Sequence, residues 1–395
     1  MRLWLPGGEH AARFLDERIA MKRPPRFPGY MEPGVPQWRR WWLALLLLWG
    51  AQLGLTLALW PEGRPRQELW LLCVTVPLAW SLALALRSLV WQVGLINHDA
   101  HSATVEAALR DWWHRRGATL PVEQVLLLGP AGDAHRHYQG LMAATPVPEP
   151  VLLADGEPVL RCQVSLRRAE ERHAALGQHL ARQLLALPEQ NIRWPGVRGL
   201  AWVGEAEGRA AFVEALATAG VLLPEHRWSL HSLDDLDVLI DCFPRACPED
   251  VDVLLCAGVV SLAGAEEGVM PGEAGFAWVI GHRGAVQLHR GEYLLAGKES
   301  ASEACTQMQR YAGLNEAPAH CLALDAASHL AFVESGWQAG AHQLVAHWGA
   351  LGLLAPFVGM SLASLQVQES SQPCGWLCAQ GERGMAMGVV VHGNG

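Results

Sequence analysis

The chain has 395 residues, of which 51% are hydrophobic and 17% are charged, and its formal net charge is −9. The charge is unevenly placed, because residues 1–95 carry 11 basic and 6 acidic side chains whereas residues 96–395 carry 19 basic and 33 acidic ones. Nucleic acids bind to cationic surfaces, so the acidic body argues against a nucleic-acid partner.

The first part of the chain, residues 1–40, is a basic and proline-rich arm. Residues 9–23 have the pattern of a short amphipathic helix. Residues 23–36 contain five prolines, which remove backbone donors and fix φ, so an extended path is expected there.

Two uncharged apolar runs follow, at residues 41–60 and 69–86, and only residues 61–68 separate them. About 20 helical residues span a hydrocarbon core of about 30 Å, so residues 41–95 are predicted to form a transmembrane hairpin. The alternative is a helical hairpin buried in a soluble core. It is disfavoured because neither run has a polar face.

The basic residues predict the orientation of this hairpin. Eight precede the first run, whereas Arg64 and Arg66 in the turn are accompanied by Glu62 and Glu68. The positive-inside rule therefore places both termini in the cytoplasm. A cleaved signal peptide fits poorly, since the first run begins forty residues into the chain and is too long.

Beyond the hairpin, stretches with helix and strand patterns alternate. This alternation predicts an α/β fold with a largely buried sheet, in two halves at residues 96–247 and 248–395. The expected helices are residues 97–116, 166–187, 208–219 and 346–366, the last kinked or interrupted at Pro356. The expected strands are residues 122–130, 199–205, 251–262, 275–282, 321–327, and a closing hairpin of 375–380 with 384–392.

Nine cysteines are scattered along the chain without a CxxC pair. The missing paired spacings argue against a zinc site, and reduced thiols agree with a cytoplasmic body. The histidine pairs His98 with His101 and His135 with His137 are weak metal candidates, because seventeen histidines make chance pairs common. No cofactor is predicted.

Two further patterns have ordinary explanations. The strand-to-helix turn at residues 199–209 lacks GxGxxG, so a dinucleotide site is not expected. Asp234, Asp235, Asp237 and Asp241 are interpreted as one solvated helix start rather than as paired catalytic carboxylates.

Two segments resemble the β-ketoacyl synthases, which are enzymes of the thiolase fold. Residues 248–282 are similar to the family's strand, variable loop and GE-type turn, with Gly272, Glu273 and Gly275 in the turn. Residues 344–365 are similar to the segment in which a catalytic histidine precedes a Gly-Ala-rich helix, with His347, Gly349 and Gly352 at matching positions. The resemblance implies a layered αβαβα body.

The family also needs a thiolate at a strand-to-helix turn, and here the resemblance is incomplete. The turn is expected at residues 203–209, which contain no cysteine, and Trp348 follows His347 where a substrate channel needs small residues. We therefore expect a catalytically inactive body with a relict site. The alternative is an acyl-transfer enzyme that uses Cys242, Cys247 or Cys256 with His347.

The layout also resembles bacterial membrane-anchored adaptors that load lipase effectors onto type VI secretion spikes, with residues 348–352 as the shared WGALG-type motif. This resemblance implies an inner-membrane protein whose cytoplasmic body binds a protein partner. A homodimer is expected because proteins of the thiolase fold are usually dimeric. A small-molecule sensor that uses the relict acyl pocket is a third possibility.

Overall fold

The computed structural model describes most of the chain, and its description covers residues 21–61, 66–133, 137–138, 147–153, 156–164, 168, 171–188, 192, 194–224, 227–262, 269–295, 298–338, 344–380 and 384–393. The chain forms two compact units. One is Pro24–Trp113, and the other joins Met1–Arg23 to His114–Gly395. The expected helix at residues 9–23 lies largely outside the described residues.

The smaller unit contains two helices that are long and apolar enough to cross a membrane, α2 (Trp38–Ala58) and α3 (Arg66–Arg116). They run antiparallel. Trp41 lies against Trp80 with ring centroids 4.9 Å apart, and the Gln52 amide donates to the Thr75 hydroxyl at 2.9 Å. The second apolar run and the helix expected at 97–116 are one continuous helix of 51 residues.

Pro77 lies inside α3, where its missing N–H leaves the carbonyl of Cys73 without its usual helical donor. The Trp49 indole of α2 donates to that carbonyl at 3.0 Å. The neighbouring helix thus satisfies the backbone group that the proline releases, which explains why α3 continues through it.

The proline-rich arm is extended, as expected, and it runs along α3 in the opposite direction. Pro28 lies near His101, whose Nε2 is 3.2 Å from the proline carbonyl, and the Arg87 guanidinium donates to the Gly34 carbonyl at 3.1 Å. Pro33 fills the space beside Gly94, where a Cβ would lie 2.9 Å from the proline ring. The arm and the helix are therefore one packed element.

The body is built on a ten-stranded mixed sheet in the order β10-β11-β12-β8-β1-β7-β6-β4-β5, with β9 paired to β12. Its strands are β1 (Thr119–Leu128), β4 (Val197–Gly204), β5 (Arg227–Ser229), β6 (Val253–Ser261), β7 (Glu273–Gly281), β8 (Val286–His289), β9 (Glu292–Leu294), β10 (His320–Ala323), β11 (Cys374–Ala379) and β12 (Met385–His392). A separate pair joins β2 (Val151–Leu152) to β3 (Pro158–Val159).

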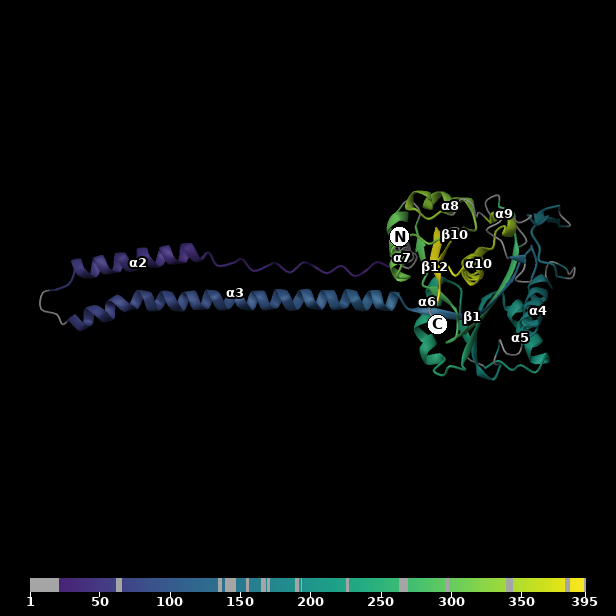
Figure 1. Ribbon diagram of the computed structural model, residues 1–395, viewed down its shortest axis with the longest axis horizontal. Coiled ribbons are helices and arrows are strands. Elements are labelled where there is room, and N and C mark those ends of the chain that lie inside the picture. Colours follow the sequence, from purple (N-terminus) through teal and green to yellow (C-terminus); the bar gives the residue numbers. More distant parts are fainter. Residues whose placement is uncertain are drawn as a thin grey trace, which may run out of the picture. The chain divides into compact units, whose positions relative to one another are not determined.

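Helices cover both faces of this sheet, which confirms the predicted α/β fold (Figure 1). The body helices are α4 (Arg172–Leu185), α5 (Ala206–Thr218), α6 (Leu233–Ala246), α7 (Ala301–Tyr311), α8 (Ala326–Phe332), α9 (Val345–Trp348) and α10 (Ala355–Ser370). Helices α4 and α5 pack on the outer face of β4, β6 and β7, whereas α6 and α10 share the central core with both halves of the sheet. Strands β1 and β8 pair and thereby join the two halves.

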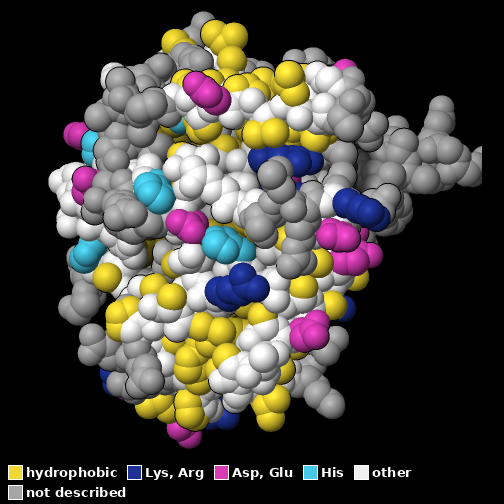
Figure 2. All heavy atoms as spheres, turned by 90° about the vertical axis from the view of Figure 1, so that its right-hand side faces the viewer, with side chains coloured by type: hydrophobic (Ala, Val, Ile, Leu, Met, Phe, Trp, Pro, Cys, Tyr) yellow, Lys and Arg dark blue, Asp and Glu magenta, His cyan; other side chains and the backbone are white. Residues whose placement is uncertain are grey.

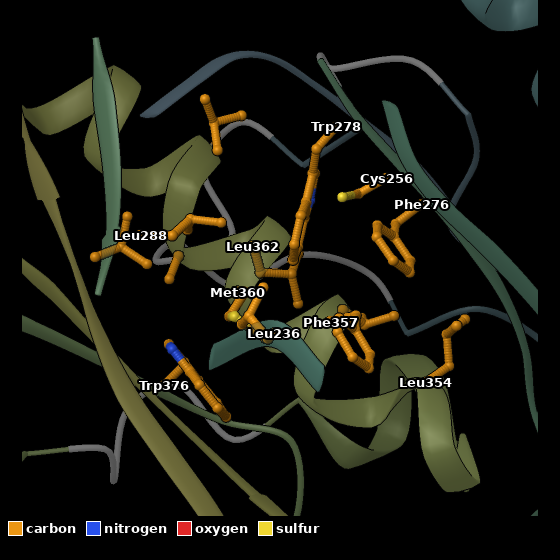
Figure 3. Packing of buried hydrophobic residues seen from close by; sticks show 14 of the residues in the cluster. Leu236, Cys256, Phe276, Trp278, Leu288, Leu354, Phe357, Met360, Leu362 and Trp376 are labelled. Carbon is orange, nitrogen blue, oxygen red and sulfur yellow. The ribbon is translucent and has the colours of Figure 1, made fainter. Parts of the chain in front are cut away.

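The central core is aromatic and closely packed around α10. Phe357 stacks on Phe276 at 5.4 Å, and the Trp278 indole donates to the Ser361 hydroxyl at 2.8 Å (Figure 3). Trp376 of β11 closes the opposite side of α10. This helix is buried nearly all round, which explains why its sequence has no polar face.

The closing hairpin is confirmed, since β11 and β12 pair antiparallel. The helix expected at 346–366 is interrupted earlier than Pro356. The chain leaves α9 at Gly349, where φ is +65°, and Pro356 lies in the first turn of α10, where its missing N–H needs no partner. The strand expected at 321–327 ends at Ala323, because Asp325 accepts from the Ser328 N–H at 2.7 Å and starts α8.

Candidate functional site

The GE-type turn and the histidine segment, far apart in sequence, lie side by side. The Gly272 N–H donates to the Ala350 carbonyl at 3.0 Å, and the Ala350 N–H donates to the Met270 carbonyl at 2.8 Å. A Cβ on Gly272 would collide with the Trp348 carbonyl, so only glycine permits this approach. Both segments with family resemblance therefore meet at one place.

Trp348 fills the position next to His347. Its side chain is 1% exposed and stacks on Tyr138, with ring centroids 5.7 Å apart and planes 19° apart. The indole also lies against Gly129, where a Cβ would be 2.5 Å from the ring. His347 itself is half-buried.

Little space is left beside this stack. The cavity lined by Gly129, Gly132, Cys162 and neighbouring residues measures about 10 Å³, roughly the space of one water. This cavity is therefore too small for a substrate chain.

The candidate thiols do not have the environment of a nucleophile. Cys256 lies in the middle of β6 and is fully buried beside Trp278 and Phe276 (Figure 3). Burial raises the pKa of the Cys256 thiol well above its ordinary value, and it raises the pKa of Cys247 to about 11. Catalytic thiols need the opposite shift. Cys242 is half-buried near the end of α6.

Among the described residues, two short strand-to-helix turns precede the GE-type turn, and neither contains a cysteine. The longer connection from β3 to α4 contains Cys162, but burial raises the pKa of this thiol well above its ordinary value. The expected turn, at residues 203–209, leads from β4 into α5, which lies in the outer layer. The second turn, at residues 230–232, leads from β5 into α6 in the central core, and Ser232 caps that helix by accepting from the Asp235 N–H at 3.2 Å. This second turn was not predicted from the sequence, because β5 has only three residues and its pattern is too short to recognise.

Glu273 of the GE-type turn is part of a buried ion-pair network. Its carboxylate accepts two bonds from the Arg172 guanidinium, one of them at 2.8 Å, and a third from the Ser261 hydroxyl at 2.8 Å. It also accepts from the Cys162 N–H at 3.0 Å. Because every oxygen of Glu273 is engaged by the chain itself, we interpret the residue as a fixture of the fold.

A second charged network lies where the chain enters the body. The Arg116 guanidinium donates to the Asp237 carboxylate at 2.6 Å, to the Glu292 carboxylate, and to the Tyr311 hydroxyl at 3.0 Å. Tyr311 in turn donates to Glu292 at 2.9 Å. Asp237 therefore departs from the solvated helix start predicted for it, because it faces this cation inside the body.

Lys22 extends the same network from the other side of the chain. The Lys22 ammonium lies 2.7 Å from the Asp237 carboxylate and 2.6 Å from the Asp234 carboxylate. The Lys22 backbone N–H donates to the Glu292 carboxylate at 3.1 Å. Partial burial lowers the pKa of Lys22, but the carboxylates of Asp237 and Asp234 raise it more, so the net change is upward. Residues on both sides of the smaller unit in the sequence thus converge on one pair of carboxylates.

The histidine pairs are not brought together as a metal centre. His98 and His101 flank the ring of Tyr30, at 6.2 and 5.5 Å between centroids. His137 lies beside Gly132, and His135 lies outside the described residues. Over the residues that the structure describes, no group of three or more His, Cys, Asp and Glu side chains is arranged to hold a metal ion.

The body also carries an apolar groove that sequence reasoning did not find. Its volume is about 710 Å³, which is within the range of ligand and peptide pockets. It lies where α4 and α5 end, on the layer that faces the viewer in Figure 2, and hydrophobic side chains gather over the lower part of that face. Lining residues include Leu185, Leu187, Trp194, Arg198, Val221 and Val251.

Comparisons with known proteins agree with this architecture. No protein-family model matches the chain, and no curated protein matches its sequence. Among solved structures, the ishigamide ketosynthase/chain length factor is similar with a TM-score of 0.50 and 12% identity, over 70% of this chain and 99% of that one. The OzmH KS8 ketosynthase domain of Streptomyces albus (TM-score 0.45, 10% identity, 70% and 96% covered) and OleA of Xanthomonas campestris (0.42, 10%, 69% and 98%) are also similar. The likeness to the ishigamide ketosynthase/chain length factor shows that the body has a ketosynthase-like fold.

Proposed function

We propose that the protein is a non-catalytic, membrane-anchored adaptor whose ketosynthase-like body binds a protein partner. The proposal rests on one observation: where a ketosynthase needs a substrate channel and a reactive thiol, this body has closely packed side chains. Trp348 occupies the space next to His347, and the two short strand-to-helix turns lack a thiol. Cys162, in the longer β3–α4 connection, is buried. A nucleophilic mechanism needs an activated nucleophile within reach of its base.

The anchor in this proposal is the pair of helices α2 and α3. Both are apolar, and their windows of highest hydropathy are 0% and 6% buried. The basic residues gather on the side of the chain ends, which supports a two-pass anchor in the bacterial inner membrane with both termini in the cytoplasm. The test is a reporter that is active only in the cytoplasm, fused after Gly395. We expect this fusion to be active.

The apolar groove is the surface that we assign to the partner, with a secretion effector as its class. Interfaces are anchored by aromatic and apolar side chains in pockets, and the groove offers Trp194 with Val221 and Val251 beside it. The acidic charge of the body favours a partner with a basic rim.

The test compares three full-length proteins purified in detergent: the wild type, Val221→Glu in the groove, and Leu330→Glu as a matched control. Leu330 is 72% exposed on α8, outside the groove. We expect a stoichiometric partner with the wild type and the control, and at least about tenfold less with the groove variant. Recovery of no partner by the wild type, or equal recovery by Val221→Glu, contradicts the proposal.

Thiol alkylation separates the adaptor from the alternative enzyme. In the native protein we expect slow, burial-limited labelling of Cys247 and Cys256, because burial raises both pKa values. One thiol that reacts much faster than a free cysteine, and whose rate falls in His347→Ala, favours the acyl-transfer enzyme instead.

A further inference from the structure

Helix α3 carries two lengthwise rows of side chains on opposite faces. One row is half-buried because α2 and the arm cover it, and it includes Arg87, Trp91, Gly94, His98, His101 and Val105. The other row is exposed along its whole length. It consists of Leu82, Leu86, Leu89, Val93, Ile96, Ala100, Ala103 and Ala107.

The spacing of the exposed row is the heptad spacing of a coiled coil. Its members are alternately four and three residues apart from Leu82 to Ala107 without exception. That length is more than three heptads, or about 38 Å of helix. The row stops where the next two positions are Arg110 and His114, whose charges cannot enter an apolar seam.

Much of this row lies outside the part of α3 that pairs with α2. Trp41, near the start of α2, lies against Trp80, and the first turn of α2 contains the cations Arg39 and Arg40. Arg87 bonds to the arm rather than to α2. Because charged side chains mark the edge of the hydrocarbon, we place this edge at Arg87, earlier than the end of the hairpin predicted over residues 41–95. The part of α3 beyond Arg87 then lies on the polar side of the edge.

The apolar residues beyond that edge are therefore without lipid cover. Leu89 is 59% exposed, Val93 is 49% exposed and Ile96 is 66% exposed. A continuous exposed apolar row of this kind marks an interface with another protein.

We propose that a second copy of this chain covers the row, so that two α3 helices form a parallel two-stranded coiled coil. A hairpin anchored in one membrane gives every copy the same direction, and identical rows are self-complementary about a two-fold axis. The a positions of the row are Leu86, Val93, Ala100 and Ala107, and the d positions are Leu82, Leu89, Ile96 and Ala103. Val93 with Leu89 is the pairing that favours two strands. Leu86 and Ile96 do not follow it, so the assignment to two strands rests on the two-fold self-complementarity of the row. The alanines at 100, 103 and 107 let the helices approach closely. This inference does not depend on what the body binds.

The test is the mass of the full-length protein in detergent, measured by sedimentation equilibrium. We expect the wild type to be a dimer and Leu89→Glu/Ile96→Glu to raise its dissociation constant by about 100-fold or more, because two carboxylates per chain enter the seam. Leu95→Glu is the matched control. Leu95 is 37% exposed on the same helix but lies outside the row, so this variant should remain dimeric.

Two results overturn the proposal. A monomeric wild type means that lipid or another protein covers the row. A dimer that survives the double substitution means that the copies associate through another surface, such as the body. Near-ultraviolet circular dichroism of each variant verifies that the body is folded, so that loss of the dimer is not caused by unfolding.

Discussion

Substitution of the buried cation Arg116 tests whether its ion pairs with Asp237 and Glu292 stabilise the body. Its side chain is 10% exposed, and the carboxylates of Asp237 and Glu292 that it pairs with are 9% and 4% exposed. Arg116→Met keeps most of the apolar stem but removes the cation shared by two buried carboxylates. Asp237 keeps contacts with Lys22 and Arg290, so the loss falls mainly on Glu292.

Removing one partner of a buried ion pair costs about 3–5 kcal/mol, since the other charge stays desolvated. For a body of this size, 1 kcal/mol changes the melting temperature by about 2–4 °C, so we expect a decrease of about 6–20 °C. Arg110→Met is the matched control. Its pair with Glu106 is 3.5 Å long and more than two-thirds exposed on both sides, so its loss should cost less than about 1 kcal/mol.

The pH dependence adds a second readout. Burial raises the pKa of Glu292, and Arg116 opposes that rise, so the pKa increases further in Arg116→Met. A carboxyl whose folded-state pKa is raised binds its proton more tightly when folded, so acidification stabilises the folded state. The deficit of the variant should therefore shrink as the pH falls from about 8 to about 5.

Thermal unfolding of the detergent-solubilised full chain measures these effects, followed by tryptophan fluorescence. Glu292→Gln in the Arg116→Met background should restore part of the stability, because it removes one uncompensated charge. A loss below about 1 kcal/mol in Arg116→Met, or a further loss on adding Glu292→Gln, refutes the reasoning.

Three further predictions follow from single contacts. Trp348→Ala should destabilise the body by about 3–5 kcal/mol because it empties a fully buried site, whereas Leu330→Ala at an exposed site should cost less than about 0.5 kcal/mol in the same urea titration. Trp49→Phe should weaken the packing of α2 on α3 by about 1–3 kcal/mol because the Cys73 carbonyl loses its donor, and Trp42→Phe, at a 57% exposed ring, should have no such effect in a detergent unfolding titration. Burial lowers the pKa of His289 from 6.5 to about 4, so stability present above pH 6.5 should fall by about 3 kcal/mol as the pH decreases through that interval. His289→Gln should flatten this part of the pH profile, and an unchanged profile contradicts the assignment.

The elements with long, uniform patterns were predictable from the sequence. Strands β6 and β7 consist of nine residues each and are almost entirely apolar, and α2 has no charge over most of its length. Such patterns leave few alternatives, because a buried strand and a membrane span each need an unbroken apolar run. The family resemblance identified the segments that contain Gly272 and Ala350, but their contact was not predicted and is a finding of the structure.

The parts that could not be predicted depend on partners distant in sequence. The three-residue strand β5 is specified by pairing with β4, and its pattern is too short to recognise alone. Asp237 has the sequence context of a solvated helix start, yet Arg116, 121 residues earlier, makes it a buried ion-pair partner. The apolar groove is likewise assembled from segments between Leu185 and Val251.

The charged network around Arg116 also fixes the two segments at which the chain enters and leaves the body. Residues Met21–Arg23 and 114–116 are the places where the chain passes between the body and the smaller unit, and Lys22 and Arg116 share Asp237 and Glu292. Apolar packing alone would tolerate sliding of these two segments, whereas paired buried charges fix their register because any displacement leaves a charge unpaired. Removing Lys22 as well as Arg116 should therefore release both segments together, and increased proteolysis at residues 21–37 in Arg116→Met alone would show that the two segments are coupled through the shared carboxylates.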